Sequence, residues 1–262
     1  MPIGSKKLLR KQEYATAASQ HATITTAGVE ISSNYSKFGT TSLRTLVGST
    51  DPTNPLSGDH LGDCQITVYP KDTSWYMNKN YPWTVEFWVA SGDATWYQAA
   101  EPNVPMAWID PKKLSDVNFP IPYSDVAPKP KITMTHSGSQ GVYLFQYDNG
   151  DTFQRTFTTV PDWIHMAAVS NGSGNFKWFV NGVVGSGSQA YSDTQNTRTF
   201  SFGLYAETFI SEWTDGIYYE NIRISNIARY TGSFTPPTTP FTPDANTLAI
   251  FPFQGDTLDK AF

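Results

Sequence analysis

Paired carboxylates on one strand face are the first chemistry to test in this sequence, because two acidic side chains can cleave a glycosidic bond. A retaining pair needs its carboxyl groups about 5–5.5 Å apart. Glu86 is the only acid in the predicted strand Trp83–Val89, whereas Asp215 and Glu220 are five residues apart and fall on opposite faces of an ideal strand. This spacing disfavours a glycanase, and we predict no catalytic residue.

Other catalytic arrangements find no better support. No serine lies in a Gly-x-Ser-x-Gly elbow, and the run Gly185–Ser188 is typical of a flexible turn. His165 follows Trp163 by two residues on a predicted strand, which favours a buried, hydrogen-bonded imidazole over a catalytic base or a ligand. We therefore predict a non-enzymatic protein. The histidines are scattered along the chain at His21, His60, His136 and His165.

Neither a metal nor a cofactor is predicted. The single cysteine, Cys64, excludes a cysteine-based zinc site and an internal disulfide. Loop aspartates could supply oxygen ligands to calcium, but they lack EF-hand spacing, and a turn-forming role is favoured. These loop acids are Asp148, Asp151, Asp193 and Asp215.

A group of aromatic residues lies in or beside a proline-rich stretch. Exposed aromatic faces there could bind a sugar or a partner protein. The alternative is a satellite core that pins the long loop, and the sequence leaves both interpretations open. The candidate ligand or partner surface is Trp96, Tyr97, Trp108 and Tyr123.

Charge is unevenly distributed along the chain. The net charge of −5 disfavours a nucleic-acid binder, and no apolar run is long enough for a secretory signal or a bilayer span. Residues 1–20 carry a net charge of +3, so the remaining residues carry a net charge of −8. This distribution predicts a basic docking arm, with a solvated, frayed terminus as the alternative. The candidate anchoring residues are Lys6, Lys7, Arg10 and Lys11.

The elements that must position these residues are β-strands. Threonine outnumbers leucine, and apolar residues alternate with polar ones from residue 21 onward. Asn-Gly pairs, as at Asn181-Gly182, supply the positive φ angles of tight hairpin turns. The pattern predicts an antiparallel sandwich or barrel. Predicted strands include Trp83–Val89, Thr152–Thr158, Trp163–Ser170, Asn175–Val180, Thr199–Tyr205 and Gly216–Ser225.

We predict an extended basic arm over residues 1–20 and one antiparallel β domain over residues 21–262. Glu101–Lys131 holds seven prolines, so residues 99–131 are expected to form a surface excursion with one short strand near Met106–Ile109. A second proline-rich stretch, Thr235–Asp244, must be extended and rigid.

Three segments are similar to the laminin-G-like, concanavalin A-like jelly rolls of virion structural proteins in tailed bacteriophages. They are Ser36–Leu43 followed by Trp83–Val89, then Trp163–Gly182, and then Asn221–Phe241 running into Asp244–Leu248. The third is the most specific, because its Ala-Arg-Tyr and Phe-Thr-Pro-Pro runs follow the phage version. The resemblance implies an all-β, two-sheet antiparallel sandwich with one concave face.

The resemblance also implies a function. The expected protein is a non-enzymatic capsid decoration or short appendage, assembled in the host cytoplasm and located on the virion. Its partners would be other virion proteins of the capsid or tail, and a homo-oligomer is compatible with this. The alternative is a host-adhesion protein that binds a surface glycan. The C-terminal run Thr247–Thr257 is expected to fill a strand position that family members fill from the N-terminus, in its own sandwich or in a neighbour's.

Overall fold

Alternation along strand β6 (Pro82–Ser91) explains why the chain forms sheets. In the computed structural model, Val85, Phe87 and Val89 are buried on one face of this strand. Thr84, Glu86 and Trp88 occupy the other face and are buried as well, with Glu86 fully enclosed. A strand with polar residues on its second face usually leaves that face in water. Here a second layer of chain must cover it.

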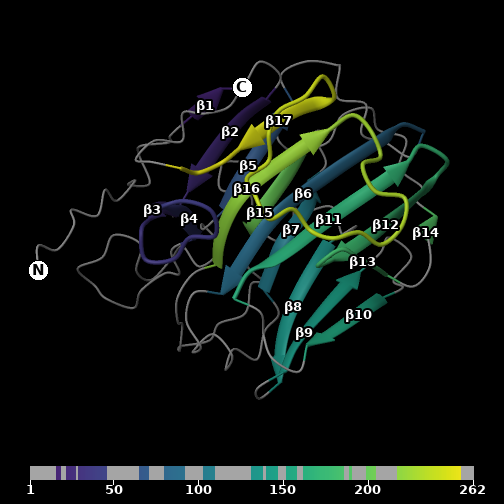
Figure 1. The fold of residues 1–262 in the computed structure, drawn as a ribbon, viewed down its shortest axis with the longest axis horizontal. Helices are drawn as coiled ribbons and strands as arrows, with labels where there is room; N and C mark the ends of the chain where they lie inside the picture. Colours follow the sequence, from purple (N-terminus) through teal and green to yellow (C-terminus); the bar gives the residue numbers. More distant parts are fainter. Residues whose placement is uncertain are drawn as a thin grey trace, which may run out of the picture.

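The structure describes residues 16–18, 22–27, 29–45, 65–70, 80–91, 103–109, 131–137, 140–146, 152–157, 162–185, 189–190, 199–204 and 217–254. Within these ranges every strand pairing is antiparallel, and the strands form two sheets (Figure 1). The all-β antiparallel sandwich predicted from the sequence is therefore confirmed.

The eight-stranded sheet has the order β1-β2-β5-β15-β7-β8-β9-β10. Its register places alternate residues of neighbouring strands on common faces, as with Phe200 opposite both Val68 and Trp108. Its strands are β1 (Thr16–Ala18), β2 (Ala22–Ala27), β5 (Gln65–Pro70), β7 (Asn103–Ile109), β8 (Lys131–Ser137), β9 (Gln140–Gln146), β10 (Thr152–Phe157) and β15 (Thr199–Leu204).

The nine-stranded sheet has the order β13-β12-β11-β6-β16-β4-β3, with β14 beside β12 and β17 beside β16. It carries the side chains discussed below. Besides β6, its strands are β3 (Val29–Ser32), β4 (Ser42–Thr45), β11 (Ile164–Asn171), β12 (Asn175–Val180), β13 (Val183–Val184), β14 (Gln189–Ala190), β16 (Ile217–Ser225) and β17 (Thr247–Phe251).

The eight-stranded sheet bears on two sequence predictions. The strand expected near Met106–Ile109 is present and longer, as β7, and it lies between β15 and β8, whereas residues 99–102 and 110–130 of the expected excursion lie outside the described residues. The proline at position 105 is accommodated because the β7–β8 register shifts between Asn103 and Met106. At the other end of the chain, Thr16–Ala18 pairs with β2, so the sheet begins inside the predicted arm.

The hairpin between β12 and β13 forms as the sequence predicts. Asn181 and Gly182 have φ angles of 48° and 74°, the left-handed values that a two-residue hairpin turn needs. The C-terminal strand β17 pairs with β16 of its own chain, so it completes its own sandwich. Strands β16 and β17 are thus an antiparallel pair joined by residues 226–246, which we call the outer loop.

The outer loop folds back over the nine-stranded sheet. Figure 1 shows it crossing in front of β6, β11 and β12 before it returns to β17. We call the covered side of this sheet the outer face, since its opposite side carries Val85, Phe87 and Val89. The outer face therefore lies under the chain itself.

Candidate functional site

A bulge in β16 brings an acidic and a basic side chain to the outer face. Glu220 lies opposite Trp88 and Arg223 lies opposite Glu86, and the register shifts between them. Asn221 takes the extra place in the strand with a φ of 51°. In an unbroken strand residues 220 and 223 would face opposite sides. The bulge therefore places Glu220 on the same face as Glu86.

Glu86 is the centre of a buried polar cluster. Its Oε1 accepts a hydrogen bond from Nε of Arg223 at 2.8 Å, and the NH2 of Arg223 lies 2.6 Å from the same atom. Its Oε2 accepts the hydroxyl of Tyr230 at 2.7 Å and lies 3.2 Å from Nε2 of His165. Because an ionised carboxylate only accepts, Nε2 is the donor in this contact. His165 is fully buried, as the sequence predicted.

The cluster stabilises the charged form of Glu86. Burial raises the pKa of a carboxyl group, but the hydrogen bond from His165 and the positive charge of Arg223 outweigh it, and the pKa of Glu86 falls below its ordinary value. Burial and the adjacent Glu86 charge both raise the pKa of Tyr230. Tyr230 is therefore a hydrogen-bond donor to Glu86 at any physiological pH.

Arg229 and Asp244 close the base of the outer loop. Two nitrogens of the Arg229 guanidinium group donate to the two carboxylate oxygens of Asp244 at 2.9 and 2.8 Å, and these bonds lower the pKa of Asp244. The backbone N–H of Asn226 donates to the carbonyl of Asn246 at 3.0 Å. Thr84 Oγ1 accepts the backbone N–H of Arg229 at 3.0 Å, which fastens this base to β6. The two ends of the outer loop therefore lie next to each other.

The middle of the outer loop is held by the β12–β13 hairpin. The backbone N–H of Phe234 donates to the carbonyl of Gly182 at 2.8 Å, and Ser233 Oγ accepts the N–H of Val184 at 3.3 Å. The ring of Phe234 stacks on Tyr230 and packs against Phe179. These contacts cover the apolar group formed by Ala167, Val169 and Phe179.

Glu220 anchors a second covering segment. Its carboxylate accepts the backbone N–H groups of Lys37 at 2.6 Å and Phe38 at 3.0 Å. Ser36 Oγ and Gln254 Nε2 also donate to it, at 3.4 and 2.5 Å. Burial raises the pKa of Glu220 above its ordinary value, and the two backbone hydrogen bonds only partly offset this. Glu220 thus ties the segment before β4 to the segment after β17.

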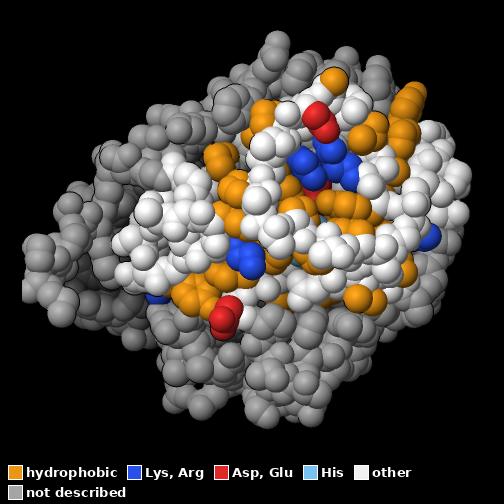
Figure 2. All heavy atoms as spheres, in the orientation of Figure 1, with side chains coloured by type: hydrophobic (Ala, Val, Ile, Leu, Met, Phe, Trp, Pro, Cys, Tyr) orange, Lys and Arg blue, Asp and Glu red, His pale blue; other side chains and the backbone are white. Residues whose placement is uncertain are grey.

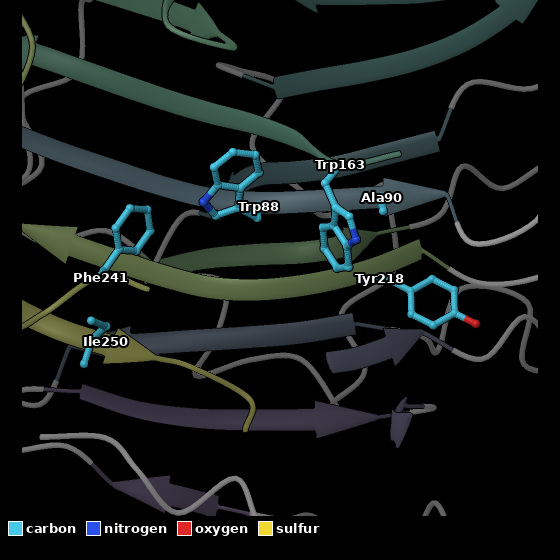
Figure 3. Close-up of a cluster of buried hydrophobic side chains, with 6 residues drawn as sticks. All are labelled: Trp88, Ala90, Trp163, Tyr218, Phe241 and Ile250. Atoms are coloured by element: carbon cyan, nitrogen blue, oxygen red, sulfur yellow. The ribbon is translucent and has the colours of Figure 1, made fainter. Parts of the chain in front are cut away.

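A hydrophobic cluster rich in aromatic side chains also lies on the outer face (Figure 3). Tyr35 stacks on Trp163 with ring centroids 5.5 Å apart, and Phe38 meets Trp88 edge-on at 5.6 Å. The ammonium group of Lys37 lies 4.3 Å from the centre of the Trp88 ring. The buried members are Trp88, Ala90, Trp163, Tyr218, Phe241 and Ile250.

This arrangement supports structural rather than catalytic chemistry. Glu86 and Glu220 are both fully buried, and their oxygens are occupied by donors from the chain. Among the described residues, no group of three or more His, Cys, Asp or Glu side chains could hold a metal ion. In the same part of the chain, Nδ1 of His165 and the side-chain amide of Asn221 are buried without a hydrogen-bond partner.

The described part of the chain does not test the residues predicted as anchors and as a ligand surface. Lys6, Lys7, Arg10 and Lys11 lie outside the described residues, as do Trp96, Tyr97 and Tyr123. The backbone of Trp108 lies in β7. These assignments stay predictions.

The sequence did not single out Arg223, Arg229 and Tyr230 as members of a site. A signal for two of them was present in the Ala-Arg-Tyr run after β16, which carried the family resemblance but no assigned role.

No protein-family model matches the chain, and no curated protein matches it. Among solved structures, the receptor-binding domain of botulinum neurotoxin D is 14% identical with a TM-score of 0.45, and the match covers 86% of this chain and 50% of that one. The serotype G binding domain is 12% identical with a TM-score of 0.44, over 80% of this chain and 44% of that one. A serotype D ligand-binding domain in complex with N-acetylneuraminic acid is 13% identical, with a TM-score of 0.44 and coverages of 85% and 49%.

The chain therefore spans half or less of the length of these toxin domains. Among its described residues, the structure has no helix with the length and apolar character needed to cross a membrane.

Proposed function

We propose that this chain is a non-enzymatic structural protein of a phage virion, displayed on the particle as a capsid decoration or short appendage. The observation that carries the proposal is the structural role of the Glu86 and Glu220 side chains. Both carboxylates are buried on the outer face and hold the chain's own segments across it, so neither faces a substrate. The similarity of three sequence segments to phage virion jelly rolls is the reason for proposing a phage particle as its location.

In this proposal the basic arm attaches the protein to the particle. Lys6, Lys7, Arg10 and Lys11 would contact an acidic surface of a capsid or tail protein, while the sandwich, which carries the remaining negative charge, faces outward. Such an attachment weakens as salt concentration rises, because exposed charges are screened. Homo-oligomerisation on the particle is compatible with this arrangement.

The test is the position of the protein on a purified particle, by immunogold electron microscopy. A variant lacking residues 1–15 tests the arm. Thr16–Ala18 is kept in this variant because it forms β1 of the sheet. We expect the full chain on the particle surface and the truncated chain folded but unattached. Absence of the full chain from purified particles would overturn the virion assignment.

A host-adhesion protein that binds a surface glycan is the second candidate, carried by the aromatic residues Trp96, Tyr97, Trp108 and Tyr123. A glycan array with the purified chain separates the two functions. Binding to a defined glycan that is lost in Trp96→Ala would favour adhesion, whereas no binding favours the structural role.

A further inference from the structure

The same dipeptide, Asn-Gly, occurs at two places in the described part of the chain, at Asn171-Gly172 and at Asn181-Gly182. Asn171 ends β11, and Asn181 follows β12. An asparagine before glycine can lose its amide group by cyclisation, because glycine has no Cβ to keep its backbone nitrogen away from the asparagine side chain. The surroundings of the two pairs differ, so the fold treats two identical dipeptides differently.

The Asn171 side chain is exposed, and its oxygen is bound by two donors of one residue. Oδ1 of Asn171 accepts the backbone N–H of Ser173 at 3.0 Å and the hydroxyl of Ser173 at 2.7 Å. These bonds turn the side chain back along the Gly172 backbone and draw electrons away from Cγ. Attack on Cγ places negative charge on Oδ1, where both donors already point. The turn therefore contains its own oxyanion-binding arrangement.

The backbone nitrogen of Gly172 is the attacking atom in such a cyclisation, and the structure holds it in place. Its N–H donates to Oγ of Ser170 at 3.2 Å, and that hydroxyl donates to the carbonyl of Tyr81 at 3.1 Å. Ser170 is fully buried, so these bonds fix the position of the nitrogen. The connection between β11 and β12 lies at the margin of the molecule, where water reaches it (Figure 1).

The Asn181 side chain is held away from this chemistry. Its Oδ1 accepts the backbone N–H of His165 at 2.9 Å, and its own backbone N–H donates to the His165 carbonyl at 2.8 Å. Gly182 is buried, and its carbonyl accepts the N–H of Phe234 at 2.8 Å. Attack by the Gly182 nitrogen would require the side chain to leave His165, which would strand a buried N–H without an acceptor. The fold therefore protects Asn181.

We propose that Asn171-Gly172 is a self-modifying site, at which asparagine converts spontaneously to isoaspartate and aspartate while Asn181 persists. The Gly172 nitrogen gives its proton to hydroxide and bonds to Cγ of Asn171. The bond from Cγ to Nδ2 then breaks, and ammonia leaves with a proton taken from water. The cyclic succinimide takes up one water molecule. Opening at Cγ gives aspartate, and opening at the backbone carbonyl gives isoaspartate. Water is the co-reactant, and nothing is oxidised or reduced.

The conversion has a structural consequence for the end of the hairpin. Asn171 is the register partner of Pro82 in the last pair of β11 with β6. A Cβ on Gly172 would lie 2.9 Å from the backbone nitrogen of Pro82, so the turn has little room for the longer backbone of isoaspartate. Each conversion also adds a negative charge, and Figure 2 shows few acidic side chains among the described residues on the face drawn there. This inference is independent of the proposed virion function.

The experiment incubates the purified full chain at neutral and at mildly alkaline pH. Peptide mapping by mass spectrometry follows the exchange of amide for carboxyl at each Asn-Gly pair, and methylation by a protein-isoaspartate methyltransferase detects isoaspartate. Ser173→Ala removes the hydroxyl donor, and Ser173→Thr keeps it. Asn171→Gln is the control, because glutamine would have to close a larger ring. Circular dichroism melts establish that each variant is folded, and a parallel incubation in urea removes the fold.

We expect Asn171 to convert at least about tenfold faster than Asn181 in the folded chain, because only Asn181 must give up a bond to a buried N–H. Conversion should be faster at alkaline pH, since the attacking nitrogen must lose its proton. Ser173→Ala should slow conversion at least about twofold, and Ser173→Thr should restore it. In urea the two pairs should convert at similar rates.

Equal rates at the two pairs in the folded chain would overturn the proposal. A difference that persists in urea would also overturn it, because it would arise from the local sequence and not from the fold. A Ser173→Ala chain that converts as fast as the unchanged chain would show that the hydroxyl does not assist. Isoaspartate labelling that is undiminished in Asn171→Gln would place the modification elsewhere and overturn the assignment.

Discussion

Glu86 and Glu220 lie on one face of one sheet, and each holds a different segment of the chain across that face. Glu86 receives the hydroxyl of Tyr230 from the outer loop, and Glu220 receives the backbone N–H groups of Lys37 and Phe38. Their electrostatic settings differ, since Glu86 is surrounded by a guanidinium group and an imidazole, whereas Glu220 is bound mainly by backbone and amide donors. The two carboxyl groups therefore respond oppositely to pH.

Replacing Glu86 with Gln should strongly destabilise the protein. The change leaves the buried guanidinium group of Arg223 without its counter-charge, and breaking a buried pair in this way costs about 3–5 kcal/mol. Urea unfolding measures the loss. Asp162→Asn, at an exposed acid, is the control and should change the free energy of unfolding by less than about 0.5 kcal/mol. A Glu86→Gln protein as stable as the control would show that the cluster does not hold the loop.

Acid should remove the contribution of Glu86. Its pKa in the folded chain lies below the ordinary value of 4.5, so its stabilisation is complete above that value and is lost as pH falls through the lower folded pKa. The stability difference between the unchanged chain and Glu86→Gln should therefore shrink below about pH 4. Unfolding curves across pH 2–7 test this. A difference that stays constant to pH 2 would contradict it.

Glu220 should show the opposite trend. Its pKa is raised in the folded chain, so the folded state holds the proton more tightly than the unfolded state does. The stabilisation from that proton is present below pH 4.5 and is lost as pH rises through the higher folded pKa. Titration of the Glu220 carboxyl carbon by NMR should give a midpoint above that of an unfolded peptide. A midpoint below the peptide value would overturn this expectation.

Gly182→Ala should displace the outer loop. Gly182 has a φ of 74°, and a Cβ there would overlap the carbonyl oxygen of Phe234. Gly174 is a matched control, because its φ is 80° and a Cβ added to it would meet no atom within 4 Å. Gly174→Ala should cost only the backbone strain of about 1–2 kcal/mol, and Gly182→Ala should cost more. Equal thermal destabilisation of the two variants would mean that the position of the outer loop does not depend on the close contact between Gly182 and Phe234.

Asp244→Asn should loosen the base of the outer loop with little effect on global stability. Its side chain is 45% exposed, and exposed ion pairs contribute about 1 kcal/mol or less. Hydrogen exchange should accelerate over residues 226–246, while β6 and β11 stay protected. Exchange that accelerates equally in β6 would show that the loop does not open separately from the sheet.

The strands and tight turns were predictable because their signals are local. Alternation in Trp83–Val89 and the Asn181-Gly182 turn depend on residues adjacent in the chain. The contact between Glu86 and Tyr230 joins residues 144 positions apart, and no single-sequence pattern reports such a distance. The interior position of β7 was hidden by its proline, which the sequence rules place at sheet edges. The register shift that accommodates this proline arises from the pairing of β7 with β8, so the sequence of neither strand alone reveals it.

The bulge at Asn221 has a consequence for insertions and deletions in this strand. Tyr219 and Ile222 both belong to the inner face, and Glu220 and Arg223 both belong to the outer one, so Asn221 is a single supernumerary residue. Deleting it would restore unbroken alternation with every neighbour on its present side. Replacing it with valine would keep the length but force a β-branched side chain into a φ of 51°. At this position we expect the strand to tolerate deletion of the residue better than its replacement by a β-branched one.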